Sequence, residues 1–313
     1  MMMTNLFSFH LEHPVPDLAE AVVNLVTLCD LDDHGVPDIT LADIQQMWST
    51  LDLSHNVWIA LTDQTQLVGY AFLDIRGETR MDTCVFVHPD YKGNGIGSAL
   101  LDQAEQRAYE LTGGREGQRL MNHLPFTNTL ARRLAEARGY TFQRLYQRMK
   151  LVLDKNPLPE GAAVPKGIRI EPIRPGQDEG LLHGIYEASF QDAWGYSTKD
   201  AAVWIKEQQG DAYDPSLWFI AWEGTKPIGF LISNLQDDGL FIELLGVVRS
   251  HRHRGVGQAL LTYAFAAGYA RGERTVLLYV DTDSLTGAQR LYRKLGMQPD
   301  LQTALYVKEL AVK

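Results

Sequence analysis

An apolar run, a glycine turn and an amphipathic stretch follow one another over residues 243–269. The run Glu243–Val248 has the length of a strand, and after its glutamate it contains only apolar residues and glycine. The turn 249–257 is basic and contains glycine. Beyond it, apolar residues recur at helical spacing at positions 260, 261, 264, 265 and 269. The pattern predicts a strand, a glycine turn and a helix, in that order.

The same order of elements occurs 160 residues earlier in the chain, where Gly95 corresponds to Gly255. The loop K-G-N-G-I-G begins at Lys92, and the loop R-H-R-G-V-G begins at Arg252. Downstream, A-R-R-L-A-E-A-R-G-Y ends at Tyr140 and A-Q-R-L-Y-R-K-L-G-M ends at position 297. Two ordered copies of a pair of motifs indicate a duplicated domain.

Helices and strands are interspersed in both copies. The patterns predict helices at 15–30, 40–48, 94–111, 128–138, 176–190, 197–209, from 258 onward and at 286–295. They predict strands at 57–61, 67–75, 81–88, 119–124, 140–153, 168–172, 217–222, 227–234, 241–248, 275–281 and 301–308. We expect an α/β protein with a mixed sheet in each half, of the α+β kind, and not a doubly wound parallel sheet. Three prolines mark 154–166 as a linker between domains 1–153 and 167–313.

Composition limits the class of protein. Of the 313 residues, 45% are apolar and 22% are charged, as in an ordinary globular protein. The net charge of −10 argues against nucleic-acid binding, which needs a basic face. Acidity weakly favours a cationic substrate such as an amine, although solubility explains it equally well.

Hydropathy and cysteine content bear on the compartment. The chain has no apolar run of roughly 20 residues that would span a membrane, and its start lacks the basic and apolar regions of a secretory leader. Cys29 and Cys84 are the two cysteines, and both lie in apolar patterns, which favours free buried thiols. We therefore expect a cytoplasmic protein without a membrane partner.

The glycine turns are suited to phosphate. A helix N-terminus presents unpaired N–H groups and a partial positive charge, and Gly255 and Gly257 allow a phosphate to approach the backbone. Neither the dinucleotide fingerprint nor the P-loop is present, because position 260 is leucine and no Gly-Lys-Ser/Thr follows. The residues R-H-R-G-V-G resemble the Q/R-x-x-G-x-G/A signature of the GNAT (GCN5-related) N-acetyltransferases. Both copies together make the chain similar to a tandem GNAT protein.

This resemblance implies a cosubstrate, acetyl-CoA, and the residues that hold it. They are Leu245, Val247, Arg252, His253, Arg254, Gly255, Val256, Gly257, Gln258 and Ser284 in the second copy, and Lys92, Gly93, Asn94, Gly95, Gly97 and Asn128 in the first. Ser284 departs from the asparagine that related sequences often carry there. Asn128 begins a segment that fits the family's N-x-x-A. The chemistry requires no metal.

Acetyl transfer to an amine requires a base, a donor to the carbonyl oxygen and a proton for the departing thiolate. Tyr292 is the candidate acid, because it occupies the tyrosine of the family's L-Y-x-K-x-G pattern. Glu243 is the candidate base, as the one charged residue of an apolar strand beside the loop. The plainer alternatives are a half-buried helix aromatic and a solvent-facing strand residue.

The first copy lacks both proton carriers. Ala135 replaces Tyr292, and Thr83 corresponds to Glu243. We expect the second copy to be active and the first to be catalytically degenerate, whether it binds acetyl-CoA or serves only the structure. Aromatic residues around 190–195 lie where the family places its variable acceptor loop, although core packing is the commoner fate of such residues.

Three functional classes remain open. The leading one is an acetyl-CoA-dependent N-acetyltransferase acting on a small-molecule amine, present as a monomer or homodimer. The second is an acetyltransferase of protein N-termini, as in ribosomal-protein acetyltransferases. The third is a non-catalytic acyl-CoA sensor, against which the joint presence of Tyr292 and Glu243 argues.

Overall fold

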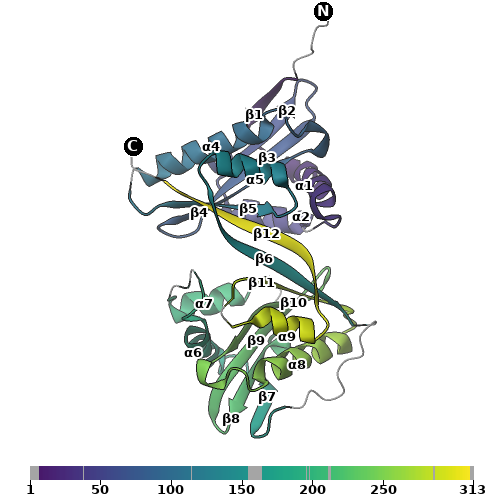
Figure 1. The fold of residues 1–313 in the computed structure, drawn as a ribbon, viewed down its shortest axis with the longest axis vertical. Coiled ribbons are helices and arrows are strands. Elements are labelled where there is room, and N and C mark those ends of the chain that lie inside the picture. Colours follow the sequence, from purple (N-terminus) through teal and green to yellow (C-terminus); the bar gives the residue numbers. More distant parts are fainter. Residues whose placement is uncertain are drawn as a thin grey trace, which may run out of the picture. The chain divides into compact units, whose positions relative to one another are not determined.

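A computed structural model describes residues 7–37, 39–113, 115–153, 164–194, 196, 198–210, 213–284 and 286–310. The chain forms two compact units, Met1–Leu145 with Leu301–Lys313, and Tyr146–Asp300 (Figure 1). None of the helices in the described residues combines the length and apolar character needed to cross a membrane.

The first unit contains a mixed sheet. Its strands lie in the order β1 (Phe9–Glu12), β2 (Val57–Thr62), β3 (Leu67–Ile75), β4 (Arg80–Val87), β5 (Arg119–Pro125) and β12 (Gln298–Glu309). Strands β4 and β5 are parallel, and the other neighbours within this unit are antiparallel.

Helices cover both faces of this first sheet. The helices are α1 (Ala19–His34), α2 (Leu41–Thr50), α3 (Leu53–Asn56), α4 (Ile96–Thr112) and α5 (Thr129–Ala137), with 3-10 turns η1 (Pro16–Leu18) and η2 (Pro89–Tyr91). Val57 and Ile59 of β2 join the core formed with α1 and α2, whereas the alternate residues Trp58 and Ala60 join the core formed with α4 and α5. The period of two along a strand thus produces two apolar layers.

The second unit repeats this design. Its strand order is β6 (Thr141–Val152), β11 (Thr275–Asp281), β10 (Gly239–Val247), β9 (Lys226–Gln236), β8 (Phe219–Glu223) and β7 (Ile168–Pro172), with β10 and β11 parallel. Its helices are α6 (Glu179–Phe190), α7 (Ala201–Gln208), α8 (Val256–Ala270) and α9 (Ala288–Lys294), with 3-10 turns η3 (Pro215–Leu217) and η4 (Arg249–His251). The predicted mixed α/β fold with two similar halves is confirmed.

Each unit takes its closing strand from the other half of the sequence. Strand β6, which ends the first repeat, pairs with β11 from Tyr146↔Asp281 to Val152↔Thr275. Strand β12, which ends the second repeat, pairs with β5 from Pro125↔Thr303 to Arg119↔Glu309. The compact units therefore differ from the expected ranges 1–153 and 167–313 in their last strand. The sequence predicts that each of these strands exists, but not which sheet edge it joins. Residues 154–163 of the expected linker lie outside the described residues.

Helix boundaries follow local capping. Thr40 caps α2 in a capping box with Asp43, as its position predicts. Helix α7 begins at Ala201, later than expected, because the Asp200 side chain accepts hydrogen bonds from the N–H groups of Ala202 and Val203.

Candidate active site

The second unit has a β-bulge at the residue that we expected to act as the base. Strand β10 pairs with β11 from Leu240↔Val276 to Ile242↔Leu278. On its other side, β10 pairs with β9, and the register shifts between Ile242 and Leu244, which makes Glu243 the inserted residue. A bulge bends its strand and turns a side chain in a new direction. Among the described residues, the β10–β11 pairing ends at this bulge, and β10 continues to Val247 beside β9.

The glycine loop follows directly. Gly255 is the N-cap of α8 with φ 81°, a conformation in which any side chain would be strained. A Cβ atom placed on Gly257 would lie 3.3 Å from Leu291 of α9 and 3.8 Å from Val247 of β10. The first turn of α8 therefore lies close to both β10 and α9, and its unpaired N–H groups are suited to an anion.

The side chain of Arg252 donates hydrogen bonds to other residues of the protein. Its Nε donates to the carbonyl oxygen of Val247 (3.1 Å), and its two terminal nitrogens donate to the carbonyl oxygen of Ser189 (2.8 Å) and to Oδ2 of Asp192 (3.3 Å). The guanidinium thus joins the end of β10 to the end of α6. These contacts give the side chain a structural role, and its expected part in holding acetyl-CoA stays a prediction.

Carboxylates contact the other basic side chains of the loop. Arg249 contacts Asp192, and Arg254 and His251 contact Glu223 at 2.6 and 3.0 Å. Hydrogen bonds from His251 and then Arg254 hold the pKa of Glu223 below its ordinary value. The loop's positive charge is therefore largely balanced within the protein. His253, which lies between Arg252 and Arg254 in the loop, has a positive φ of 61°.

Glu243 as a whole residue is exposed, yet the pKa of its carboxyl group is raised, chiefly because the protein around the carboxylate partly desolvates it. A hydrogen bond from Asn234 opposes this shift, and Nε2 of Gln236 donates to Oε1 at 3.5 Å. In this environment, the carboxylate of Glu243 takes up a proton more readily than that of an ordinary glutamate.

Tyr292 lies on α9 with 7% of its surface exposed and belongs to the core of the second unit. Burial raises its pKa to about 12, so the phenol keeps its proton at neutral pH.

Gln258 of α8 accepts a hydrogen bond from Lys294 of α9 (3.0 Å), and Oγ of Ser284 lies 2.9 Å from Oγ1 of Thr286. Helix α9 begins after Gly287, slightly later than predicted.

The first unit contains a cavity of about 330 Å³ at the corresponding place. The parallel pairing of β4 and β5 ends at Thr83↔Asn122, and the cavity lies beyond it. Of the residues expected to bind the cosubstrate, Lys92, Gly93, Gly95, Gly97 and Asn128 line the cavity, together with mostly apolar side chains of β4, α4 and α5. Asn94, which we also expected to hold the cosubstrate, donates a side-chain hydrogen bond to the carbonyl oxygen of Tyr91 (3.1 Å).

Two aspartates that the sequence did not single out hold this cavity's lysine. Nζ of Lys92 donates to Asp32 (2.7 Å) and Asp33 (3.0 Å), and Asn128 also donates to Asp33 (3.0 Å). Burial alone would lower the pKa of Lys92, but the hydrogen bonds to Asp32 and Asp33 raise it. Asn122, only 2% exposed, has a carboxamide oxygen without a partner among the described residues.

In the first unit, Thr83 and Ala135 stand where the second unit has Glu243 and Tyr292, and neither can carry the proton. Thr83 is fully buried and donates to the carbonyl oxygen of Phe72 (2.7 Å), and Ala135 is buried. Cys29 and Cys84 line the cavity as free cysteines. Burial raises the pKa of both thiols to about 12, which keeps them unreactive.

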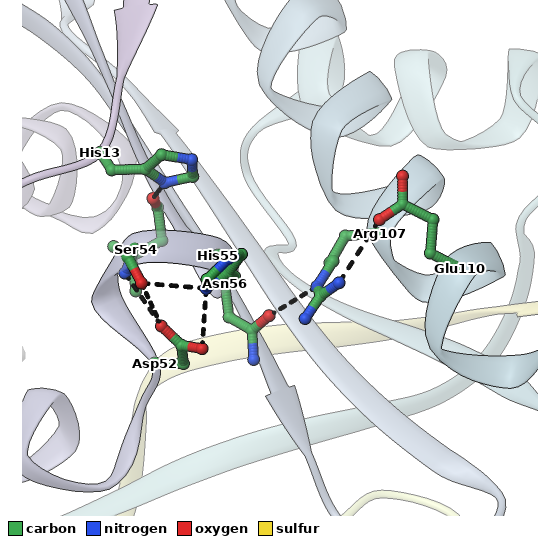
Figure 2. A network of polar contacts seen from close by, with 8 residues as sticks. His13, Asp52, Ser54, His55, Asn56, Arg107 and Glu110 are labelled. Atoms are coloured by element: carbon green, nitrogen blue, oxygen red, sulfur yellow. Dashed lines mark hydrogen bonds and ion pairs between the residues drawn. The ribbon is translucent and has the colours of Figure 1, made fainter.

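A cluster of Ser, His and Asp elsewhere in the first unit has a capping role (Figure 2). Asp52 and Ser54 both lie 2.9 Å from the same ring nitrogen, Nδ1, of His55. A catalytic triad uses both ring nitrogens to pass a proton from one partner to the other. Here Asp52 instead accepts from the N–H of Ser54 and caps α3.

The sequence is similar to those of known acetyltransferases. The model of the acetyltransferase (GNAT) family matches residues 182–297, and that of the acetyltransferase (GNAT) domain matches residues 54–149. A mycothiol acetyltransferase of Thermobispora bispora is 32% identical over 248 residues, which cover 76% of this chain and 79% of the relative. This chain belongs to the GNAT acetyltransferase family. The predicted tandem GNAT organisation and the assignment as an acetyltransferase enzyme are thereby confirmed.

Solved GNAT structures agree with the fold of the whole chain. A GCN5-related N-acetyltransferase from Sphaerobacter thermophilus has a TM-score of 0.87 and 29% identity, and the match covers 96% of this chain and 95% of that one. A tandem GNAT protein from the clavulanic acid biosynthesis pathway has a TM-score of 0.75 at 16% identity, covering 96% and 98%. The second likeness concerns the fold alone.

Proposed function

We propose that this enzyme transfers the acetyl group of acetyl-CoA to a primary amine of a small molecule, and that the reaction takes place in the second unit. The observation that carries the proposal is the position of Glu243 at the bulge where β10 leaves β11, just before the glycine loop. The mycothiol acetyltransferases among the relatives favour a small-molecule acceptor. The two free thiols, Cys29 and Cys84, fit a reducing compartment such as the cytoplasm.

The residues of the second unit fit acetyl-CoA. When bound, this cosubstrate supplies an acetyl group activated as a thioester. Gly255 and Gly257 leave the first turn of α8 without side chains that would obstruct a pyrophosphate, with Val256 between them buried in the core. The edge of β10 at Leu245 to Val247 is free of β11 and offers backbone groups to the pantetheine arm and the carbonyl oxygen.

Two side chains carry the protons. Glu243 accepts the proton that the amine loses, for which its raised pKa is favourable. Tyr292 donates a proton toward the sulfur, because its phenol remains protonated at neutral pH. Arg252 positions β10 and α6 through its two carbonyl contacts.

The first unit has the cavity and the glycines of a cosubstrate site without the proton carriers. We propose that acetyl-CoA is held there without turnover by Lys92, Gly93, Gly95, Gly97 and Asn128. This unit is also the feature that favours a second function, acyl-CoA sensing, alongside catalysis in the other unit.

A screen of primary amines tests the proposal. Purified enzyme, acetyl-CoA and each amine are mixed, and the free thiol of released CoA is measured. We expect release with a subset of small amines, and loss of that release in the Glu243→Gln variant. Binding of acetyl-CoA with no release from any small amine, together with acetylation of peptide N-termini, would overturn the small-molecule assignment.

A further inference from the structure

The carboxylate of Asp33 bridges two side chains in the wall of the first unit's cavity. Its Oδ1 accepts a hydrogen bond from Nζ of Lys92, and its Oδ2 accepts one from Nδ2 of Asn128, both at 3.0 Å. All three residues line the cavity. The side chain of Asp33 is only 9% exposed, so water competes weakly for these contacts. One carboxylate therefore engages two of the side chains that we expect to hold acetyl-CoA.

These contacts use the donors that a phosphate group would need. The carboxamide oxygen of Asn128 caps α5 by accepting from the N–H of Ala131 (3.0 Å), and its nitrogen donates to Asp33. The ammonium of Lys92 donates to Asp33 and also to Asp32 (2.7 Å). Two carboxylates beside one ammonium leave an excess of negative charge next to the glycine loop. A phosphate has the same sign of charge and is repelled while both carboxylates remain.

The second unit provides a matched comparison, because its residues follow those of the first at an offset of 160. Asp32 contacts Lys92 at 2.7 Å. The corresponding aspartate, Asp192, contacts the corresponding cation, Arg252, at 3.3 Å. Position 193, which corresponds to Asp33, is alanine. The contact between the helix end and the loop cation is thus common to both units, whereas the second carboxylate belongs to the first unit.

The cavity itself shows that the first unit has room for a ligand. Its volume of about 330 Å³ is that of a small-molecule site. Asn122 also lines it, is 2% exposed, and has a carboxamide oxygen without a partner among the described residues. Buried acceptors in proteins are nearly always paired, so an unpaired one in a cavity wall marks a place for a ligand or a solvent molecule.

We propose that the Asp33 carboxylate occupies the place of a ligand phosphate in the first unit, and that an acyl-CoA must displace it from Lys92 and Asn128 in order to bind. The inference rests on the proposed function and adds to it the residue that limits cosubstrate affinity in this unit. Asp33 lies in the last turn of α1, where the helix dipole disfavours a carboxylate, so α1 itself does not need this charge.

The test compares acetyl-CoA with S-acetylpantetheine, which has the same thioester arm and no phosphate. Isothermal titration measures the affinity of both for the full chain carrying Gly257→Asp, so that the heat reports the first unit. Asp33→Ala introduces the residue of the second unit, and Asp33→Asn keeps the shape of the side chain should alanine loosen the end of α1. Asp32→Asn is the matched control, because it removes the same charge from the same lysine at a side chain that is 49% exposed and outside the cavity lining.

We expect both Asp33 variants to bind acetyl-CoA about 10- to 100-fold more tightly than the Gly257→Asp parent, because a like charge is removed and the ammonium of Lys92 becomes available. Asp32→Asn should change this affinity less than about threefold, since solvent screens its charge. S-acetylpantetheine should bind the parent and the variants equally well, because it has no phosphate to compete with Asp33.

Equal affinities of acetyl-CoA for the parent and both Asp33 variants would refute the inference, as would an absence of binding in all three. An equal gain for acetyl-CoA and S-acetylpantetheine also refutes it, because Asp33 would then only narrow the cavity. Failure of the proposed function gives a different result. In that case, the chain without substitutions releases no CoA with any amine, while the titrations of the first unit still show the gain in the Asp33 variants.

Discussion

The contacts of Arg252 lead to a prediction that separates a structural role from phosphate binding. Replacing Arg252 with alanine leaves the carbonyl oxygens of Val247 and Ser189 without their donors. The side chain of Arg252 is 17% exposed, so water can replace these contacts only in part. A hydrogen bond to a charged group contributes about 1.5–3 kcal/mol, and two such bonds lost with partial hydration should cost about 3 kcal/mol of unfolding free energy.

This loss should lower Tm by roughly 6–12 °C, given the 2–4 °C per kcal/mol that is typical of domains of about 150–250 residues. Differential scanning calorimetry measures the shift, and isothermal titration with acetyl-CoA measures the affinity of the same variant. Arg252→Lys should recover part of the stability, because an ammonium group keeps the charge but cannot fork between two carbonyls as a guanidinium does.

Arg254→Ala is the matched control, since it removes the same charge from the same loop. The side chains of Arg254 and Glu223 are 43% and 42% exposed, so this ion pair should contribute less than about 1 kcal/mol. If Arg252→Ala keeps its wild-type Tm and loses acetyl-CoA affinity more than about 100-fold, Arg252 is a phosphate ligand and our structural assignment is wrong.

Three further predictions concern the reaction. Tyr292→Phe should lower kcat by roughly 10- to 10⁴-fold with little change in acetyl-CoA affinity, and a wild-type kcat in stopped-flow assays would exclude it as the proton donor. Since the pKa of Glu243 is raised, kcat/KM should increase with pH through a value above the ordinary glutamate pKa of about 4.3, and Glu243→Gln should remove this limb of the pH profile. Gly257→Asp should abolish turnover, whereas Gly97→Asp should leave kcat largely intact. Alanine at either position is the control, because its Cβ atom would meet nothing closer than 3.3 Å. Loss of turnover in Gly97→Asp but not in Gly257→Asp would assign the reaction to the first unit.

The sequence by itself was sufficient for the features that depend on local conformation. The two glycine turns and the helices after them were predicted from the sequence, and Gly95 and Gly255 are the N-caps of these helices, with φ values of 83° and 81° that favour glycine. The spacing of apolar residues predicted most strands and helices, since period 2 and period 3.6 reflect which side chains face a core. The internal repeat then indicated two similar folds.

The partners of individual side chains were decided by the tertiary structure. No local signal relates Lys92 to Asp32 and Asp33, about 60 residues away in the chain, because their meeting depends on how α1 packs against the glycine loop. Arg252 is a basic loop residue in the sequence, and only the fold reveals the carbonyl groups that it binds.

The exchange of β6 and β12 has the same origin. The sequence predicted a strand in each segment, but backbone hydrogen bonds along a sheet edge are nearly independent of sequence. Which edge each strand joins is therefore decided by chain connectivity and by the packing of its side chains in the completed core. Hydropathy predicted two closing strands, and the three-dimensional packing assigned each to the other half of the chain.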